Sequence, residues 1–245
     1  MARFLQTAGL AIGLIALVLQ FAITIPASMA AGRSLLGSVV FYFSFFTILT
    51  NIAAVMVHAS LLSPTGYAWF PAFAGQRMRT GVAVATTLVF IVYATVLAGL
   101  WQPQGLFLLC DILLHYVTPF IFVAWWLAAG ADGSTRWRDI SRWMAYPLAY
   151  LAYALIRAPF AGEVPYSFLD VAKNGAASVA VSALGVTALF IGLSVLAVLV
   201  DHGIGRLRGK PATHVQSSPT DRHHSQNALM PSRWASQREM PISFN

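Results

Sequence analysis

The chain has 245 residues, of which 58% are hydrophobic and only 9% are charged. A typical soluble domain carries about 25% charged residues, and a soluble fold with far fewer would leave much of its surface apolar. The composition therefore excludes an ordinary soluble enzyme and a disordered chain. A single cysteine, Cys110, also excludes a disulfide scaffold. What remains is an all-α, polytopic membrane protein.

Six apolar runs predict six transmembrane helices, because each is near or above the roughly 20 residues that cross a bilayer. The runs cover residues 4–31, 36–62, 81–101, 106–129, 143–160 and 176–200. The fifth is the shortest and the most polar. We therefore expect a six-helix bundle over residues 1–204 and a disordered cytoplasmic tail over residues 205–245, which is polar and lacks apolar periodicity.

The arginines and lysines near the span ends predict the orientation of the bundle. Nine lie on one face and three on the other. The nine are Arg3, Arg77, Arg79, Arg136, Arg138, Arg142, Arg206, Arg208 and Lys210, and the three are Arg33, Arg157 and Lys173. This bias places both termini in the cytoplasm of a cell with a bacterial-type inner membrane. It also explains the net charge of +7, because these basic residues would lie next to anionic lipid head groups and need not bind nucleic acid.

The N-terminal run has an alternative interpretation as a signal peptide, since Ser28-Met29-Ala30 resembles a cleavage site. The run exceeds the 7–15 apolar residues usual for such a peptide, so we expect a retained helix. Cleavage would leave five spans with the same orientation.

Polar residues share one face of the second span: Ser44, Thr47, Asn51 and His58. Such a stripe is typical of helix packing, although a buried Asn51 calls for a definite partner. We expect His58 to be a hydrated residue near the cytoplasmic end. It lies roughly 20 Å from the level of His115, at 1.5 Å per helical residue. The two histidines therefore cannot share a haem, and we expect neither cofactor nor metal.

On the fourth span, Asp111 and His115 are four residues apart on one helical face, and Pro119 is expected to kink the helix just beyond them. A carboxylate one turn before a histidine orients the imidazole and raises its basicity. Thr47 lies ~16 Å and His115 ~13 Å below the outer ends of their spans. If these helices are neighbours, a hydroxyl nucleophile meets a base that is held by a carboxylate.

The fifth span carries Tyr146, Tyr150, Tyr153 and Arg157 on one face. Tyr150 and Tyr153 lie too deep to be interfacial anchors, so their hydroxyl groups need partners. We expect Arg157 to pair with Asp111 or Asp170, or to reach the head groups.

Four segments together resemble one family. Residues 45–51 (FFTILTN) resemble a YFTxxSN pattern, and residues 113–119 (LLHYVTP) resemble LLHxxxP. Residues 146–157 and 165–170 resemble YPLxY…R…YPYxFLD. The chain thus resembles the six-transmembrane prokaryotic membrane proteins that are distant relatives of the androgen-induced and androgen-dependent TFPI-regulating proteins. It departs from the group at Trp125-Trp126, where an Asp-Trp pair is usual.

The eukaryotic relatives are intramembrane threonine hydrolases of fatty acid esters of hydroxy fatty acids. The resemblance implies that Thr47 is the nucleophile and His115 the base. We add Asp111 to orient His115, Asn51 to donate to the oxyanion, and Arg157, Tyr150 and Tyr153 to bind a fatty-acid ester in an outward-facing pocket among membrane lipids. The alternative is a lipid- or solute-binding or transport protein with the same pocket and no catalysis.

Overall fold

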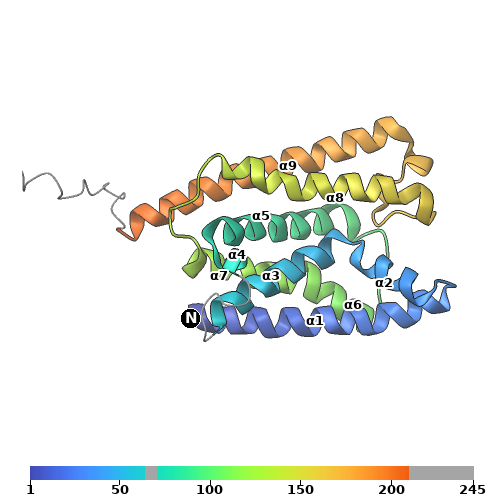
Figure 1. Ribbon diagram of the computed structural model, residues 1–245, viewed down its shortest axis with the longest axis horizontal. Coiled ribbons are helices and arrows are strands. Elements are labelled where there is room, and N and C mark those ends of the chain that lie inside the picture. Colours follow the sequence, from blue (N-terminus) through green and yellow to red (C-terminus); the bar gives the residue numbers. More distant parts are fainter. Residues whose placement is uncertain (64–70, 210–245) are drawn as a thin grey trace, which may run out of the picture. The chain divides into compact units, whose positions relative to one another are not determined.

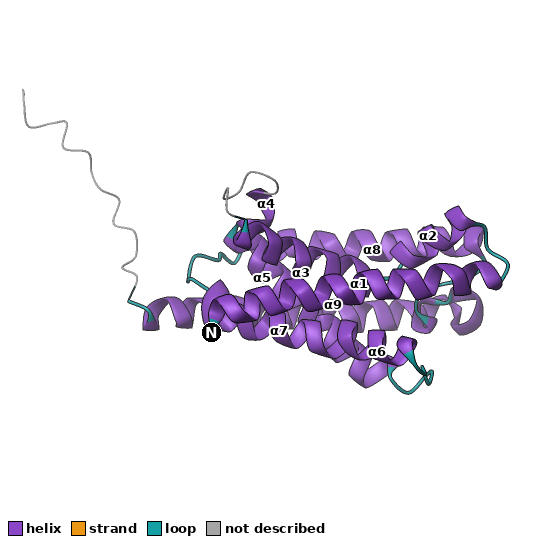
Figure 2. Ribbon diagram, turned by 90° about the horizontal axis from the view of Figure 1, so that it is seen from below, coloured by secondary structure: helices purple, strands orange, loops and turns teal. Residues whose placement is uncertain are grey.

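The computed structural model describes residues 1–63 and 71–209, in which every regular element is a helix. This confirms the predicted all-α class for these residues. The helices are α1 (Ala2–Ala30), α2 (Leu35–Phe43), α3 (Phe46–Leu62), α4 (Pro71–Ala74), α5 (Gln76–Val92), α6 (Leu106–Ile112), α7 (Thr118–Trp125), α8 (Asp139–Ala161) and α9 (Val171–Leu207). Three π-helical turns, η1 (Tyr93–Leu97), η2 (Leu113–Val117) and η3 (Trp126–Gly130), and a 3₁₀ turn, η4 (Ser167–Leu169), complete them. The long helices α1, α5, α8 and α9 run roughly along a common direction (Figures 1 and 2).

Within the described residues, four continuous helical segments are long and apolar enough to cross a membrane, and α2 with α3 makes a fifth if that bent pair is one span. The predicted count of six is not confirmed. Helix α8 is 23 residues long but is not among these segments, and it carries Asp139, Arg142 and Arg157. Large apolar side chains, such as those of Phe120 and Phe160, are exposed, which is compatible with contact with lipid. Most of the predicted tail, residues 210–245, lies outside the described residues.

Helix α5 is the central helix of the bundle, because half of its apolar stretch is buried against 22% for α9. It packs against α3, α7 and α9, while α1 covers α3 and α7. Gly9 lets α1 approach α3, since a Cβ there would lie 2.4 Å from the Nε2 atom of His58. The expectation of a hydrated His58 is therefore wrong: its ring is 2% exposed and packs against Phe122 and Trp125.

The second predicted span is broken into α2 and α3, which meet at an angle of 72°. The break falls at Ser44 and Phe45, where Phe45 adopts an extended conformation. Two tyrosines of α8 satisfy the polar groups that the break frees: the Tyr150 hydroxyl donates to the Ser44 carbonyl (2.9 Å), and the Tyr153 hydroxyl lies 2.7 Å from Ser44 Oγ. A break buried in this way is tolerated at membrane depth, because its backbone groups are paired within the protein.

Candidate active site

The helix break places Thr47 in the first turn of α3, where the backbone N–H groups have no helical acceptors. The Thr47 N–H donates instead to the Tyr166 hydroxyl at 3.3 Å, and that hydroxyl lies 3.4 Å from Thr47 Oγ1. Thr47 is 6% exposed. Its hydroxyl therefore lies beside hydrogen-bond donors and at the positive end of a 17-residue helix dipole.

His115 reaches Thr47 across the contact between η2 and α3, with 3.3 Å between Nε2 and Thr47 Oγ1. Its other nitrogen, Nδ1, lies 3.0 Å from the backbone oxygen of Asp111 and 3.2 Å from the Asp111 carboxylate oxygen Oδ1. A carbonyl oxygen only accepts, so the proton sits on Nδ1. The Nε2 lone pair is then the one that faces the threonine hydroxyl, which is the tautomer that a general base requires.

The π-helical turn η2 contains His115 and ends directly before α7, in which Pro119 is the second residue. The proline ring would clash with the carbonyl four residues earlier, which is that of His115. A wider turn accommodates the ring, and the Thr118 N–H bonds to the Leu113 carbonyl. Pro119 was expected to kink the helix; the structure shows a π turn directly before α7, a feature often found at functional sites.

Tyr93 is a residue of this site that the sequence did not single out. Its hydroxyl donates a short hydrogen bond to Asp111 Oδ2, and its ring stacks on the His115 imidazole with centroids 3.7 Å apart. Asp111 is 7% exposed. Tyr93 thus holds both the carboxylate and the imidazole from the first residue of η1.

Asn51 does not point its amide at the Thr47 hydroxyl. Its Nδ2 donates to the backbone oxygens of Thr47 (2.8 Å) and Leu114 (3.1 Å), and its Oδ1 accepts from the Thr118 hydroxyl. Both amide hydrogens are therefore engaged, which leaves none for an oxyanion. The predicted definite partner of Asn51 exists, and its contacts hold α3 against η2 and α7.

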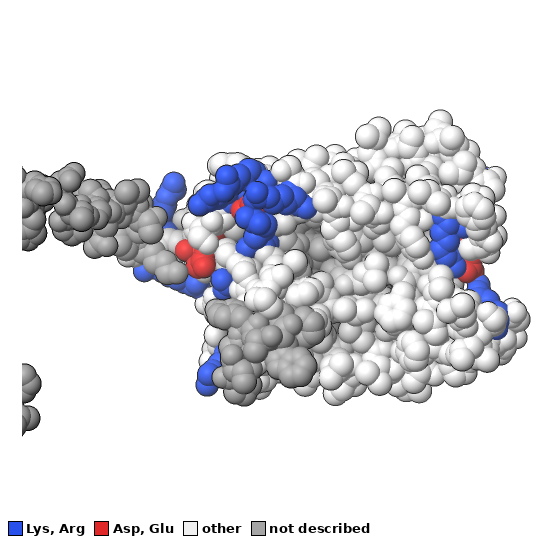
Figure 3. All heavy atoms as spheres, viewed as in Figure 1, with Lys and Arg blue, Asp and Glu red and all other residues white. Residues whose placement is uncertain are grey.

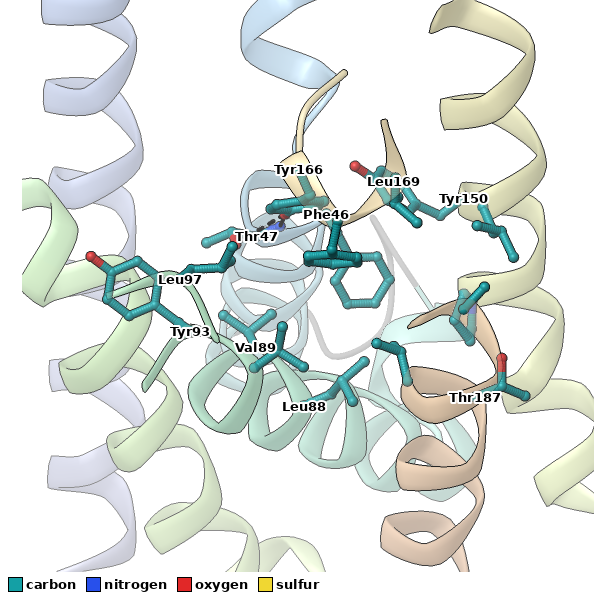
Figure 4. Close-up of a pocket in the computed structure, with 16 residues that line it drawn as sticks. Phe46, Thr47, Leu88, Val89, Tyr93, Leu97, Tyr150, Tyr166, Leu169 and Thr187 are labelled. Carbon is teal, nitrogen blue, oxygen red and sulfur yellow. Dashed lines mark hydrogen bonds between the residues drawn. The ribbon is translucent and has the colours of Figure 1, made fainter. Parts of the chain in front are cut away.

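Two cavities meet at the Thr47 side chain. The larger has a volume of about 550 Å³ and is lined by α1, α2, α6 and the loop before α9. Asp111 and His115 are among its lining residues. This volume is typical of small-molecule sites. The smaller, about 80 Å³, is lined mostly by apolar side chains of α3, α5, α8 and α9 (Figure 4). Thr47, Tyr93, Leu97 and Tyr166 line both, so the threonine lies at their junction.

The structure does not bring the three residues that we expected to bind substrate together in one cavity. Tyr150 lines the small cavity, and its hydroxyl is bound to Ser44. Tyr153 and Arg157 line neither cavity at Thr47. The pairing of Arg157 with Asp111 or Asp170 is wrong, because Arg157 binds Glu163 at 3.1 Å.

Local geometry explains the Arg157 pairing. Gly162 ends α8 in the left-handed conformation (φ 66°) and turns the chain, which brings Glu163 back to Arg157. Arg33 also binds Glu163 and lines the large cavity. Arg33 is thus the basic side chain at this cavity, a position that residue spacing alone did not reveal.

Comparison with known proteins found no matching family model, curated protein or solved structure. The interpretation of the site therefore follows from its geometry: a threonine hydroxyl, a histidine whose Nδ1 faces a backbone oxygen, a buried carboxylate beside it, and a cavity at their junction.

Proposed function

We propose that this protein is an intramembrane threonine hydrolase that cleaves lipid esters. The observation that carries the proposal is the geometry at His115: Nδ1 lies 3.0 Å from the Asp111 backbone oxygen, which can only accept, and Nε2 lies 3.3 Å from Thr47 Oγ1. This is the arrangement of an activated hydroxyl nucleophile. The resemblance to threonine hydrolases, which rests on the segments that contain Thr47 and His115, points to the same chemistry.

In the proposed reaction, Thr47 Oγ1 attacks the ester carbonyl carbon while Nε2 of His115 takes the hydroxyl proton. The tetrahedral oxyanion is stabilised by the Tyr166 hydroxyl, which accepts from the Thr47 N–H and has its own proton to donate. Burial raises the pKa of Tyr166 more than its bonds to Thr47 lower it, so the phenol keeps its proton. The intermediate collapses and the alkoxide leaves with the proton from His115. Water then attacks the acyl-threonine while His115 takes a proton from it. The second intermediate collapses, His115 returns that proton to Thr47 Oγ1, and the acid is released.

The supporting residues have separate parts in this scheme. The backbone oxygen of Asp111 orients the imidazole through Nδ1, its carboxylate Oδ1 lies 3.2 Å from the same nitrogen, and Tyr93 binds the other carboxylate oxygen. Arg33 takes the substrate-binding part that we first assigned to Arg157, because it lines the cavity that contains His115. Asn51 positions α3 against η2.

We also propose the membrane arrangement: six spans, with α8 as the least apolar one, and both termini in the cytoplasm of an inner membrane. Figure 3 supports it, because Lys and Arg gather at the two ends of the described bundle and leave a broad uncharged band between them. Arg77, Arg79, Arg136, Arg138 and Arg142 lie at the end where α5 and α8 begin.

Ester hydrolysis by the purified protein in detergent tests the function. Thr47→Ala and His115→Ala should each abolish turnover of medium- and long-chain esters, and the double variant should be no worse, because such groups act as a unit. Thr50→Ala is the matched control. Thr50 is fully buried and bonds to the Tyr146 hydroxyl at 2.9 Å, so its loss should cost about 0.5–1.5 kcal/mol of stability and leave turnover intact. Unchanged turnover in Thr47→Ala would favour the alternative, a lipid-binding or transport protein.

A further inference from the structure

A third cavity lies at the opposite end of the bundle from Arg33 and Glu163. It has a volume of about 1,030 Å³ and is formed by α4, the starts of α5 and α8, the loop before α8, and parts of α3 and α9. It shares no lining residue with the two cavities at Thr47. Nothing in the proposed hydrolysis uses it.

Basic side chains line the mouth of this cavity. Arg77, Arg136 and Arg142 contribute three positive charges, and Asp139 contributes one negative charge. Asp139 is 3% exposed and accepts from Arg77 Nε and Arg142 Nη1, both at 2.8 Å, and from the backbone N–H of Arg136. It thus fixes two guanidinium groups next to each other, and each uses one N–H donor for Asp139. The excess of two positive charges suits a phosphate, which arginines bind with paired hydrogen bonds.

The inner wall of the same cavity is apolar. It includes Ala53, Val82, Ala85, Trp143 and Phe190. Along α5 the wall continues from Arg77 to Ala85, a distance of ~12 Å at 1.5 Å per residue. An apolar wall of this depth next to a basic rim matches an amphiphile with an anionic head and an acyl chain rather than a small anion.

We propose that this cavity binds one anionic phospholipid, with its phosphate among Arg77, Arg136 and Arg142 and one acyl chain along α5. Basic pockets between membrane helices are known to hold anionic head groups, and the arginine-rich end is the one we place in the cytoplasm. The lipid would join α5 to α8 at the cytoplasmic end of the bundle.

Native mass spectrometry of the whole protein, released from detergent with added lipid, tests this. Phosphatidylglycerol should bind in a single saturable step, about tenfold or more tightly than phosphatidylcholine with the same acyl chains. The variant Arg136→Gln/Arg142→Gln should lose this preference. It retains the pair of Arg77 with Asp139, so no buried carboxylate is left alone. The control Arg138→Gln/Arg206→Gln removes the same charge from exposed positions outside the cavity and should keep the preference.

A second variant tests the acyl chain separately. Ala53→Phe fills the apolar wall without changing the charge, and it should weaken phosphatidylglycerol binding about tenfold while thermal unfolding confirms that the protein is folded. Equal binding of the two lipids would overturn the proposal, as would equal losses in the two double variants, which would mean general surface attraction. Full competition by glycerol 1-phosphate at the same concentration would show a phosphate site without a lipid, and would equally refute it.

Discussion

The hydrogen bond from Tyr93 to Asp111 is the contact whose removal best reveals how the site is held. Tyr93→Phe deletes one oxygen and retains the ring that stacks on His115 at 3.7 Å. Asp111 is 7% exposed, and the bond is to a carboxylate, for which a loss of about 1.5–3 kcal/mol is typical. We therefore expect unfolding to become easier by about 2 kcal/mol, and ester hydrolysis to fall about tenfold because His115 loses its fixed partner.

Tyr116→Phe is the matched control for this prediction. Tyr116 lies in η2, its ring packs edge-on against Tyr93, and its hydroxyl has no hydrogen bond among the described residues. Reversible unfolding in detergent and hydrolysis of a long-chain ester should both distinguish the two variants. If Tyr93→Phe is as stable and as active as Tyr116→Phe, Tyr93 does not hold the carboxylate and the account of the site is wrong.

Two further predictions concern the basic end of the bundle. A reporter enzyme that folds only in the cytoplasm should be active when it is fused to Asn245. Activity of a periplasm-specific reporter at the same position would contradict the proposed topology. Burial raises the pKa of Asp139, but the Arg136 N–H, Arg77 and Arg142 outweigh it, so the net pKa is lowered. Stability from Asp139 is then full above the ordinary aspartate pKa of about 3.9 and is lost as the pH falls below it. Thermal unfolding should therefore show that Asp139→Asn is less stable than the parent protein at pH 6, and that this difference in stability shrinks towards pH 3. A difference that stays constant would contradict this reasoning.

Sequence periodicity was sufficient for the class of fold and for one pair of residues. Apolar runs predicted helices, and the similar depths of Thr47 and His115 predicted that they would meet if their helices were neighbours, which they are. Depth is predictable because the rise of a helix is constant.

The break between α2 and α3 was not predictable in the same way. Residues 36–62 form a continuous apolar run, and the bend depends on hydrogen bonds from Tyr150 and Tyr153, which are more than 100 residues away. The break also places Thr47 at a helix start, which no local pattern indicated.

Side-chain partners were the least predictable part of the site. Arg157 and Asp111 both lie towards the outer ends of their spans, which favoured an ion pair between them. Glu163 lies only six residues from Arg157 and forms the ion pair instead. Tyr93 was missed because a single tyrosine in an apolar segment has no distinctive spacing. Tyr166 lies within residues 165–170, which carry part of the family resemblance, but nothing in that pattern indicated its contact with Thr47. The usable signal was the hydroxyl of Tyr93 within a span, which at that depth requires a partner.

The central claim is that His115 activates the Thr47 hydroxyl as a nucleophile, and covalent labelling tests it most directly. A fluorophosphonate forms a phosphonyl ester with an activated hydroxyl and releases fluoride, so peptide mapping after reaction with the purified protein identifies the oxygen that attacks. We expect the label on Thr47, lost in His115→Ala and retained in Thr50→Ala. Absence of any label on Thr47 in folded protein, or labelling of Thr47 that is unchanged in His115→Ala, would contradict the account.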